Sequence, residues 1–253
     1  VMRLVGSEMC IRDRIYILSL ITLLMLEVNS NSGTGPASEY KVTIRQIDLC
    51  DSTSTQAVCN NPVTVYSGNS GAIDIANTTA GSAAASLGNI SSANFGVSYS
   101  FVEIIMNRAF TVKGYASPDA GAATCYTTSN EAGTAALASD GSQSSSDNAS
   151  TTLFAAPAGT TTSDGNSTAF NSLTSLTDAE TAGTITSGDT FFQYRQALSK
   201  TFTLKPGNIP SVKIAFGTAN AVGASGNMGS DCNTNAAKVG LYAAEPDITI
   251  TID

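Results

Sequence analysis

The stretch Val97–Gly114 has apolar side chains at both of its alternating positions. One set consists of Tyr99, Phe101 and Ile105, and the other consists of Val102, Ile104, Met106, Phe110 and Val112. Alternation of β-branched and aromatic residues is typical of a strand, and apolar residues in both sets indicate a strand covered on both faces. We therefore predict one long strand at the centre of a two-layer β-sandwich.

Shorter stretches with the same alternation lie on both sides of this strand. Glu39–Leu49 alternates and then shifts parity, which predicts a strand with a bulge near Arg45 and Gln46. Thr190–Leu204 predicts two short strands, and Asp247–Asp253 predicts an amphipathic strand with three isoleucines on one face. Further strands are predicted at Val63–Tyr66, Ala72–Ile75, Ser211–Phe216 and Lys238–Tyr242, with a turn at Gly68–Gly71. The pattern as a whole predicts an all-β protein, an antiparallel β-sandwich.

The stretch Asn130–Asp189 differs in composition from the predicted strands. It is rich in Ser, Thr, Ala and Gly and has few apolar residues. Such a composition allows short edge strands, a surface insertion or partial disorder. We treat it as a polar insertion within a single β-sandwich domain that spans residues 39–253.

The first residues of the chain do not fit this pattern. Leu4–Asp13, with the letters LVGSEMCIRD, resembles the in-frame translation of a sequencing-library adapter. We therefore set residues 1–14 aside as an assembly artefact. Cys10 is excluded with them from the count of native cysteines.

Ile15–Leu26 is an uncharged apolar run of 12 residues. A bilayer span needs about 20 residues, so the run suits the hydrophobic region of a signal peptide, and small residues follow where cleavage would occur. A buried core helix is the alternative. With residues 15–30 as a signal peptide, the mature chain is expected to begin near Asn31 with a flexible leader at 31–38 and to contain no stable membrane span.

The charge and the missing residue types narrow the possible functions. The net charge is −8, and the first 30 residues contribute three basic and three acidic side chains, so the remaining chain carries the same charge. A negative charge argues against nucleic acid or an anionic membrane surface as a partner. The chain has no His and no Trp, and so lacks the commonest general base and metal ligand and the strongest platform for stacking sugars. We predict no catalytic site, no metal site and no cofactor.

Four cysteines remain, Cys50, Cys59, Cys125 and Cys232. An even number in an exported chain indicates disulfides, and without His or a C-x-x-C spacing a zinc site is disfavoured. Four cysteines allow three connectivities. We predict Cys50–Cys59, which closes a short polar loop, and Cys125–Cys232, which ties the ends of the insertion; the loop-entropy model assigns them about 2.5 and 4.7 kcal/mol.

Several motifs could carry chemistry. Ser38–Lys41 matches the letters S-x-x-K of penicillin-binding enzymes, but that motif works on a helix, and its K-T-G and S-D-N partners are missing. Asp164–Ser167 resembles part of a calcium loop without the full ligand spacing, so we predict a turn. Glycoside hydrolysis needs only two well-placed carboxylates, although a solvated surface explains scattered ones better. The scattered carboxylates are Asp74, Asp140, Asp147, Asp164, Asp178, Glu180, Asp189 and Asp231.

Arg108 lies among apolar residues in the predicted long strand. A charge there must be paired to be tolerated, and we predict a structural ion pair with Glu103 or Asp74 rather than a ligand contact. Four N-x-S/T sequences, at Asn77, Asn89, Asn148 and Asn166, carry little weight in a chain so rich in Asn, Ser and Thr.

Four segments follow one another over Tyr40–Gly114: YKVTI at Tyr40–Ile44, PVTVY at Pro62–Tyr66, AIDIA at Ala72–Ala76 and a Gly-x-x-Tyr step at Gly96–Tyr99 that leads into the long strand. This order resembles that of exported bacterial β-sandwich proteins of the transthyretin-like type. The resemblance implies the fold and an exported location, and it carries over no active site.

These observations favour an exported, non-enzymatic structural or adhesive protein in the periplasm, on the cell surface or outside the cell. Its partners would be further copies of itself or a cell-surface glycan. The alternative is a glycan- or small-ligand-binding module that uses tyrosines and loop carboxylates. A hydrolase is the least favoured interpretation.

Overall fold

In the part of the chain that the computed structural model describes, every element longer than three residues is a β-strand. The described residues are 31–77, 87, 93–118, 123–130, 132–134, 139–155, 167–170, 172–173, 184–206, 212–226, 232 and 240–252. The adapter-like segment and the predicted signal peptide lie outside them. The described residues contain no helix of the length and apolarity that a membrane span requires.

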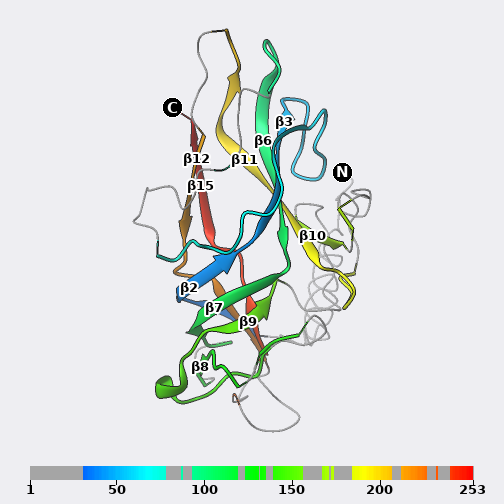
Figure 1. Cartoon of the computed structure of the whole chain (residues 1–253). Helices are drawn as coiled ribbons and strands as arrows, with labels where there is room; N and C mark the ends of the chain where they lie inside the picture. The colour runs from blue at the N-terminus through cyan, green and yellow to red at the C-terminus, as the bar shows by residue number, and fades with distance from the viewer. Residues whose placement is uncertain are drawn as a thin grey trace, which may run out of the picture. The chain divides into compact units, whose positions relative to one another are not determined.

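The strands are β1 (Asn31–Gly35), β2 (Ala37–Val42), β3 (Ile44–Asp51), β4 (Val63–Ser67), β5 (Ile73–Asp74), β6 (Ser98–Asn107), β7 (Ala109–Ala116), β8 (Cys125–Tyr126), β9 (Thr151–Phe154), β10 (Ser167–Phe170), β11 (Phe191–Thr203), β12 (Val212–Gly217), β13 (Val222–Gly226), β14 (Gly240–Ala243) and β15 (Asp247–Ile252). They form an all-β sandwich of antiparallel sheets, as predicted (Figure 1). The β6 sheet has the order β10-β11-β6-β3-β4, and the β7 sheet has the order β5-β2-β7-β8 with β9 also paired to β7. The described residues also form two smaller sheets, β1-β13-β14 and β12-β15. The predicted flexible leader at 31–38 is wrong, because β1 pairs with β13 and β2 begins at Ala37.

The prediction of a single strand at Val97–Gly114 is wrong, because the chain passes from one sheet to another at Arg108. β6 pairs with β3 and β11, whereas β7 pairs with β2, β8 and β9. The backbone N–H of Arg108 donates to the carbonyl of Thr190 at 2.9 Å instead of continuing one ladder. Apolar side chains keep the same parity on both sides of the break, so alternation alone does not reveal it.

The first predicted strand, Glu39–Leu49, changes sheet in the same way at Thr43. β2 belongs to the β7 sheet and β3 to the β6 sheet. The predicted bulge is confirmed, since the pairing of β3 with β6 shifts register between Ile44 and Gln46. The segments β2–β3 and β6–β7 therefore both connect the β7 sheet with the β6 sheet.

Most of the other predicted strands are confirmed, as β4, β5, β12, β14 and β15. The prediction of two short strands in Thr190–Leu204 is wrong, because β11 is one strand of 13 residues. Its pairing with β6 shifts between Ala197 and Phe202, and this irregularity interrupts the hydrophobic alternation.

The described parts of Asn130–Asp189 contribute an edge strand to each main sheet. β9 pairs with β7, and β10 pairs with β11 at the end of the β6 sheet. Each strand buries one large apolar side chain, Leu153 in β9 and Phe170 in β10. Short edge strands, one of the alternatives considered for this polar stretch, are what these parts form.

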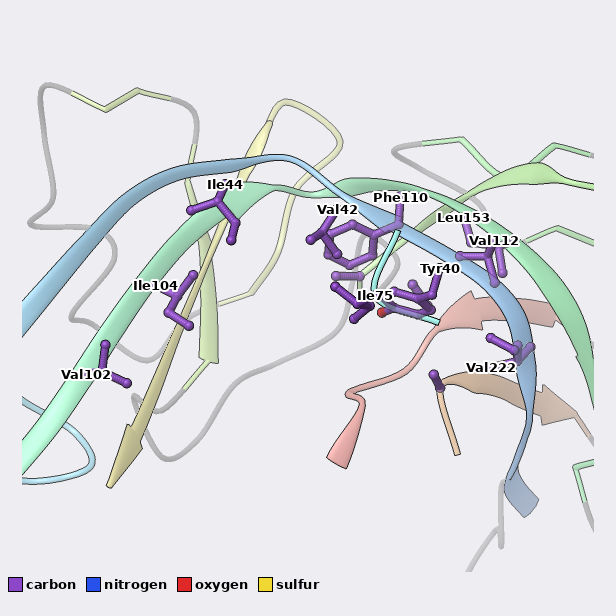
Figure 2. Packing of buried hydrophobic residues seen from close by; sticks show 14 of the residues in the cluster. Tyr40, Val42, Ile44, Ile75, Val102, Ile104, Phe110, Val112, Leu153 and Val222 are labelled. Atoms are coloured by element: carbon purple, nitrogen blue, oxygen red, sulfur yellow. The ribbon is translucent and has the colours of Figure 1, made fainter. Parts of the chain in front are cut away.

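The hydrophobic core lies on the inward faces of β2, β3, β6 and β7, against residues of β13 and β14. Figure 2 shows Val42, Ile75 and Phe110 converging where the β2–β3 and β6–β7 segments bend. The rings of Tyr40 and Phe110 pack at 5.4 Å between centroids. Each fully buried aliphatic or aromatic side chain of this kind stabilises the fold by about 1.5–3 kcal/mol.

Both predicted disulfides are present in the predicted pairing. Cys50 joins Cys59 with a Cα separation of 5.1 Å, and Cys125 joins Cys232 with a Cα separation of 5.5 Å. The first closes the loop between β3 and β4, and the second ties β8 to a residue 107 positions later. Two disulfides are compatible with an oxidising, exported location.

Candidate functional site

A cavity of about 480 Å³ lies in the core at the level where the strands bend. One wall is formed by the inward faces of β6 and β11, where Ile104 lies opposite Tyr194 and Met106 lies opposite Phe192. Val42 and Ile44, on either side of the break between β2 and β3, extend this wall. The cavity therefore occupies the region where neighbouring strands separate into different sheets.

Another part of the lining contains short side chains. Ala155, just after β9, forms an isolated parallel bridge with Ala243, and both line the cavity together with Ala244. Phe216 at the end of β12 and Pro246 before β15 also line it. The short side chains of the alanines leave space among the larger isoleucine and aromatic side chains of the lining.

The polar groups of the cavity are few and concentrated around Tyr40. The Tyr40 hydroxyl donates to the carbonyl of Ala244 at 2.8 Å, and the Tyr194 hydroxyl donates to Gln196 Oε1 at 2.6 Å. Burial, reinforced by the negative charge of Glu245, raises the pKa of Tyr40, and burial raises the pKa of Tyr242. These phenols therefore remain neutral at physiological pH.

Such a cavity suits a small molecule with a largely apolar body. Ligand sites in proteins commonly have volumes of about 300–1,000 Å³ and apolar walls with a few polar groups. The cavity is partly open to solvent, and Met106, Phe192, Phe216 and Tyr242 in its wall are only half-buried. Covering these side chains with an apolar ligand would remove their surface from water.

The opposite face of the β6 sheet holds a second buried group, which we call the outer cluster: Asp48, Glu103, Gln193 and Arg195. Glu103 forms a salt bridge with Arg195, whose Nε donates to Glu103 Oε2 at 2.9 Å. Gln193 Nε2 donates to the same oxygen at 2.9 Å. Arg195 and Gln193 are 0% exposed and Glu103 is 4% exposed, so the charges are paired inside the protein.

Asp48 lies directly across the strand pair from Glu103. Its carboxylate accepts hydrogen bonds from Thr64 Oγ1 at 2.6 Å and from Gln46 Nε2 at 2.7 Å. Burial raises the pKa of Asp48, and these two hydrogen bonds oppose the effect. The two neighbouring carboxylates are thus bound by different internal partners.

The loop between β3 and β4 folds over the outer cluster. Arg195 Nη1 donates to the carbonyl of Gln56 at 2.9 Å, and the sulfur atoms of Cys50 and Cys59 lie within 4.8 Å of a Glu103 carboxylate oxygen. The sulfurs are bonded to each other, so neither is a thiolate. The disulfide holds the loop that provides an acceptor for Arg195.

The structure corrects the role predicted for Arg108. Glu103 forms its salt bridge with Arg195, so the predicted Arg108–Glu103 pair is wrong. Arg108 is fully buried, donates through Nη1 to the carbonyl of Thr186 at 3.1 Å and lies 5.3 Å from the ring centre of Phe154. Burial lowers the pKa of Arg108, and the charge of Asp189 opposes this. Its contacts anchor the bend between β6 and β7.

The four predicted carboxylates that the structure describes lie in different environments. Asp74 accepts from the backbone N–H groups of Tyr40 and Ala76, and Asp189 accepts from the N–H of Thr186. Asp147 accepts from the Ser142 hydroxyl, in another loop. Asp140 is half-buried between the bridging residues Ser139 and Ser142. The remaining candidates lie outside the described residues: Asp164, Asp178, Glu180 and Asp231, as do Asn89 and Asn166.

The S-x-x-K letters fall on β2 and not on a helix. The Ser38 hydroxyl donates to the carbonyl of Lys113 at 3.2 Å, whereas Lys41 Nζ forms a salt bridge with Glu39. Residues three apart on a strand point to opposite faces. The two side chains are therefore engaged with different partners.

Sequence reasoning missed both the cavity and Arg195. The available signal for the ion pair was Arg195, the basic residue in the first half of β11, together with Glu103, the single acidic residue of β6. The cavity had no local signal, because its alanines come from distant segments. Comparisons with protein-family models, curated proteins and solved structures found no match, so function is inferred here from geometry.

Proposed function

We propose that this protein is an exported, non-enzymatic binding protein that holds a small, largely apolar molecule in the cavity beneath Ile104 and Tyr194. The observation that carries the proposal is a cavity of about 480 Å³ lined largely by residues of the hydrophobic core. Protein interiors have few voids larger than a water molecule. A cavity of this volume is therefore unusual for a protein interior, and ligand binding would account for it.

The energetic cost of the cavity supports this interpretation. Cavity volume that stays dry costs stability in proportion to its size, at about 24 cal/mol per Å³, so the enclosed part of this space is unfavourable when it is empty. Domains are stable by only about 5–15 kcal/mol in total. Partial opening to water lowers the cost, and an apolar ligand that displaced this water would stabilise the folded state.

The cavity also changes the ranking of the functions expected from the sequence. A structural or adhesive sandwich needs no internal cavity, whereas a small-ligand module does. The wall is aliphatic and aromatic and offers few hydrogen-bonding groups, which suits an apolar molecule better than a glycan. The two disulfides and the signal-like segment support export to the periplasm, the cell surface or the medium, and the transthyretin-like resemblance implies the same location.

Binding of the neutral fluorophore N-phenyl-1-naphthylamine tests the proposal. We expect a saturable rise in emission with one site per chain, and a rise in melting temperature with probe concentration. Ala155→Phe would fill the cavity and weaken binding at least tenfold, whereas Ala109→Phe places the same ring at an exposed position of β7 and should leave binding unchanged. Circular dichroism would check folding of both variants. Absence of saturable binding to the folded wild-type protein, or equal binding by both variants, would contradict the proposal.

A further inference from the structure

The cavity wall has a single charged side chain among the described residues that line it. Glu245 is that residue, and no Lys or Arg is present in the lining. The remaining polar side chains are three tyrosines and Ser225, all uncharged at neutral pH. An anionic ligand would therefore meet a like charge with no cation to offset it, which is unfavourable.

The position of Glu245 at the rim is set by its neighbour. The carbonyl of Ala244 accepts the hydrogen bond from the Tyr40 hydroxyl, which fixes this segment against the core. Glu245 is exposed and close enough to Tyr40 for its charge to act on the phenol. Within the described part of the chain, the salt bridges are those of Glu39 and Glu103, so Glu245 is not neutralised by a basic side chain there.

The aromatic side chains of the lining add a second preference, also for a cation. They include Tyr40 and Phe110, whose ring centres lie 5.4 Å apart, and Tyr242. Aromatic faces attract cations and favour ammonium groups over carboxylates. The carboxylate and the rings thus select for the same charge on a ligand.

We propose that the cavity takes apolar amines, with the alkyl or aryl body between the sheets and the ammonium group beside Glu245 and Tyr40. This inference rests on the proposed function and defines its ligand class. An amine ligand would satisfy Glu245 while its apolar body covers Ile104, Met106 and Phe192.

Three probes with the same chain, n-decylammonium, n-decanol and n-decanoate, test the charge preference by displacement of the fluorophore at low salt. We expect decylammonium to bind about twofold to fivefold more tightly than decanol, in line with a solvent-exposed ion pair, and decanoate to bind more weakly than decanol. The preference should shrink as salt is raised. Binding of decanol without any preference for the amine would overturn this inference and leave the proposed function standing, and so would a failure of all three probes to displace a fluorophore that binds. Absence of saturable fluorophore binding would overturn both.

Glu245→Gln separates the local charge from the charge of the whole protein. We expect decylammonium affinity to fall to that of decanol, decanoate affinity to rise and decanol affinity to stay unchanged. Asp247→Asn is the matched control, because it removes one exposed negative charge from the same segment outside the cavity wall. An equal loss of amine binding in both variants would assign the preference to net charge and overturn the inference.

Discussion

Ile104 and Ile105 are neighbours on β6, and the two faces of the sheet on which they lie are buried in different ways. Ile104 faces the cavity, with Tyr194 beside it. Ile105 lies on the face of the outer cluster and packs against Phe170 and Phe191. Both isoleucines are at most 2% exposed, so exposure alone does not distinguish their environments.

The two faces differ in whether buried polar groups have partners and whether the buried space is filled. On the outer face, polar groups from four adjacent strands and a loop are buried and hydrogen-bonded to one another. On the inner face, apolar groups enclose space that the protein leaves unfilled. Buried charges must be paired to be tolerated, so the polar groups of the outer face serve to stabilise the fold. The inner face keeps apolar surface that a ligand can cover.

The largest effect is expected when the outer ion pair is broken. Arg195→Met leaves Glu103 buried without its cation and should lower the free energy of unfolding by about 3–5 kcal/mol. Guanidinium-induced unfolding would measure this. The double variant Arg195→Met/Glu103→Leu removes both charges and should recover most of the loss. A loss below about 1 kcal/mol in the single variant would show that the outer cluster is less important than its burial indicates.

Truncation of the two neighbouring isoleucines compares the faces directly. Both Ile→Ala changes should fall within about 2–5 kcal/mol, with Ile105→Ala costing more than Ile104→Ala. Ile105→Ala opens a new void in a filled region, whereas Ile104→Ala enlarges a space that already exists. Denaturant titration of both variants measures the difference, and a larger cost at Ile104 would mean that the cavity is filled in solution.

Removal of the loop disulfide should have a smaller effect. Cys50→Ser/Cys59→Ser frees the loop over the outer cluster and is expected to cost about 2.5 kcal/mol. Binding of the apolar fluorophore should stay unchanged, because the loop covers the face opposite the cavity. Weakened binding at a temperature where the variant remains folded would show that the two faces are coupled.

The smallest effect is expected from Asp48→Asn and depends on pH. Burial raises the native-state pKa of Asp48 above its unfolded value of about 3.9, so the folded protein binds the proton more tightly. Ionisation of Asp48 therefore costs stability, and the wild-type protein should lose stability relative to Asp48→Asn as pH rises from the unfolded pKa through the native pKa. We expect a change of about 1 kcal/mol or less, comparable to one hydrogen bond. Thermal melts between pH 3 and pH 7 would measure it, and a gain in relative stability over this range would reverse the assigned sign.

Local features of the chain were predictable from the sequence. Alternation placed β4, β12, β14 and β15, and the parity shift placed the bulge after Ile44. Cysteine number and spacing led to both disulfides. These features depend on residues close together in sequence, or on the few pairings that four cysteines permit.

The tertiary structure decided the features that depend on how distant strands meet. Parity runs unchanged through Arg108, so only strand pairing reveals that β6 and β7 belong to different sheets. The partner of Glu103 lies 92 residues away, and pairing followed the register of β6 with β11 rather than proximity to Arg108. The cavity depends on Ala155 and Ala243, which come from distant segments, lining the same space as Ile104. An alanine in the sequence indicates a small side chain, and whether its missing volume is filled depends on which residues the fold places across from it.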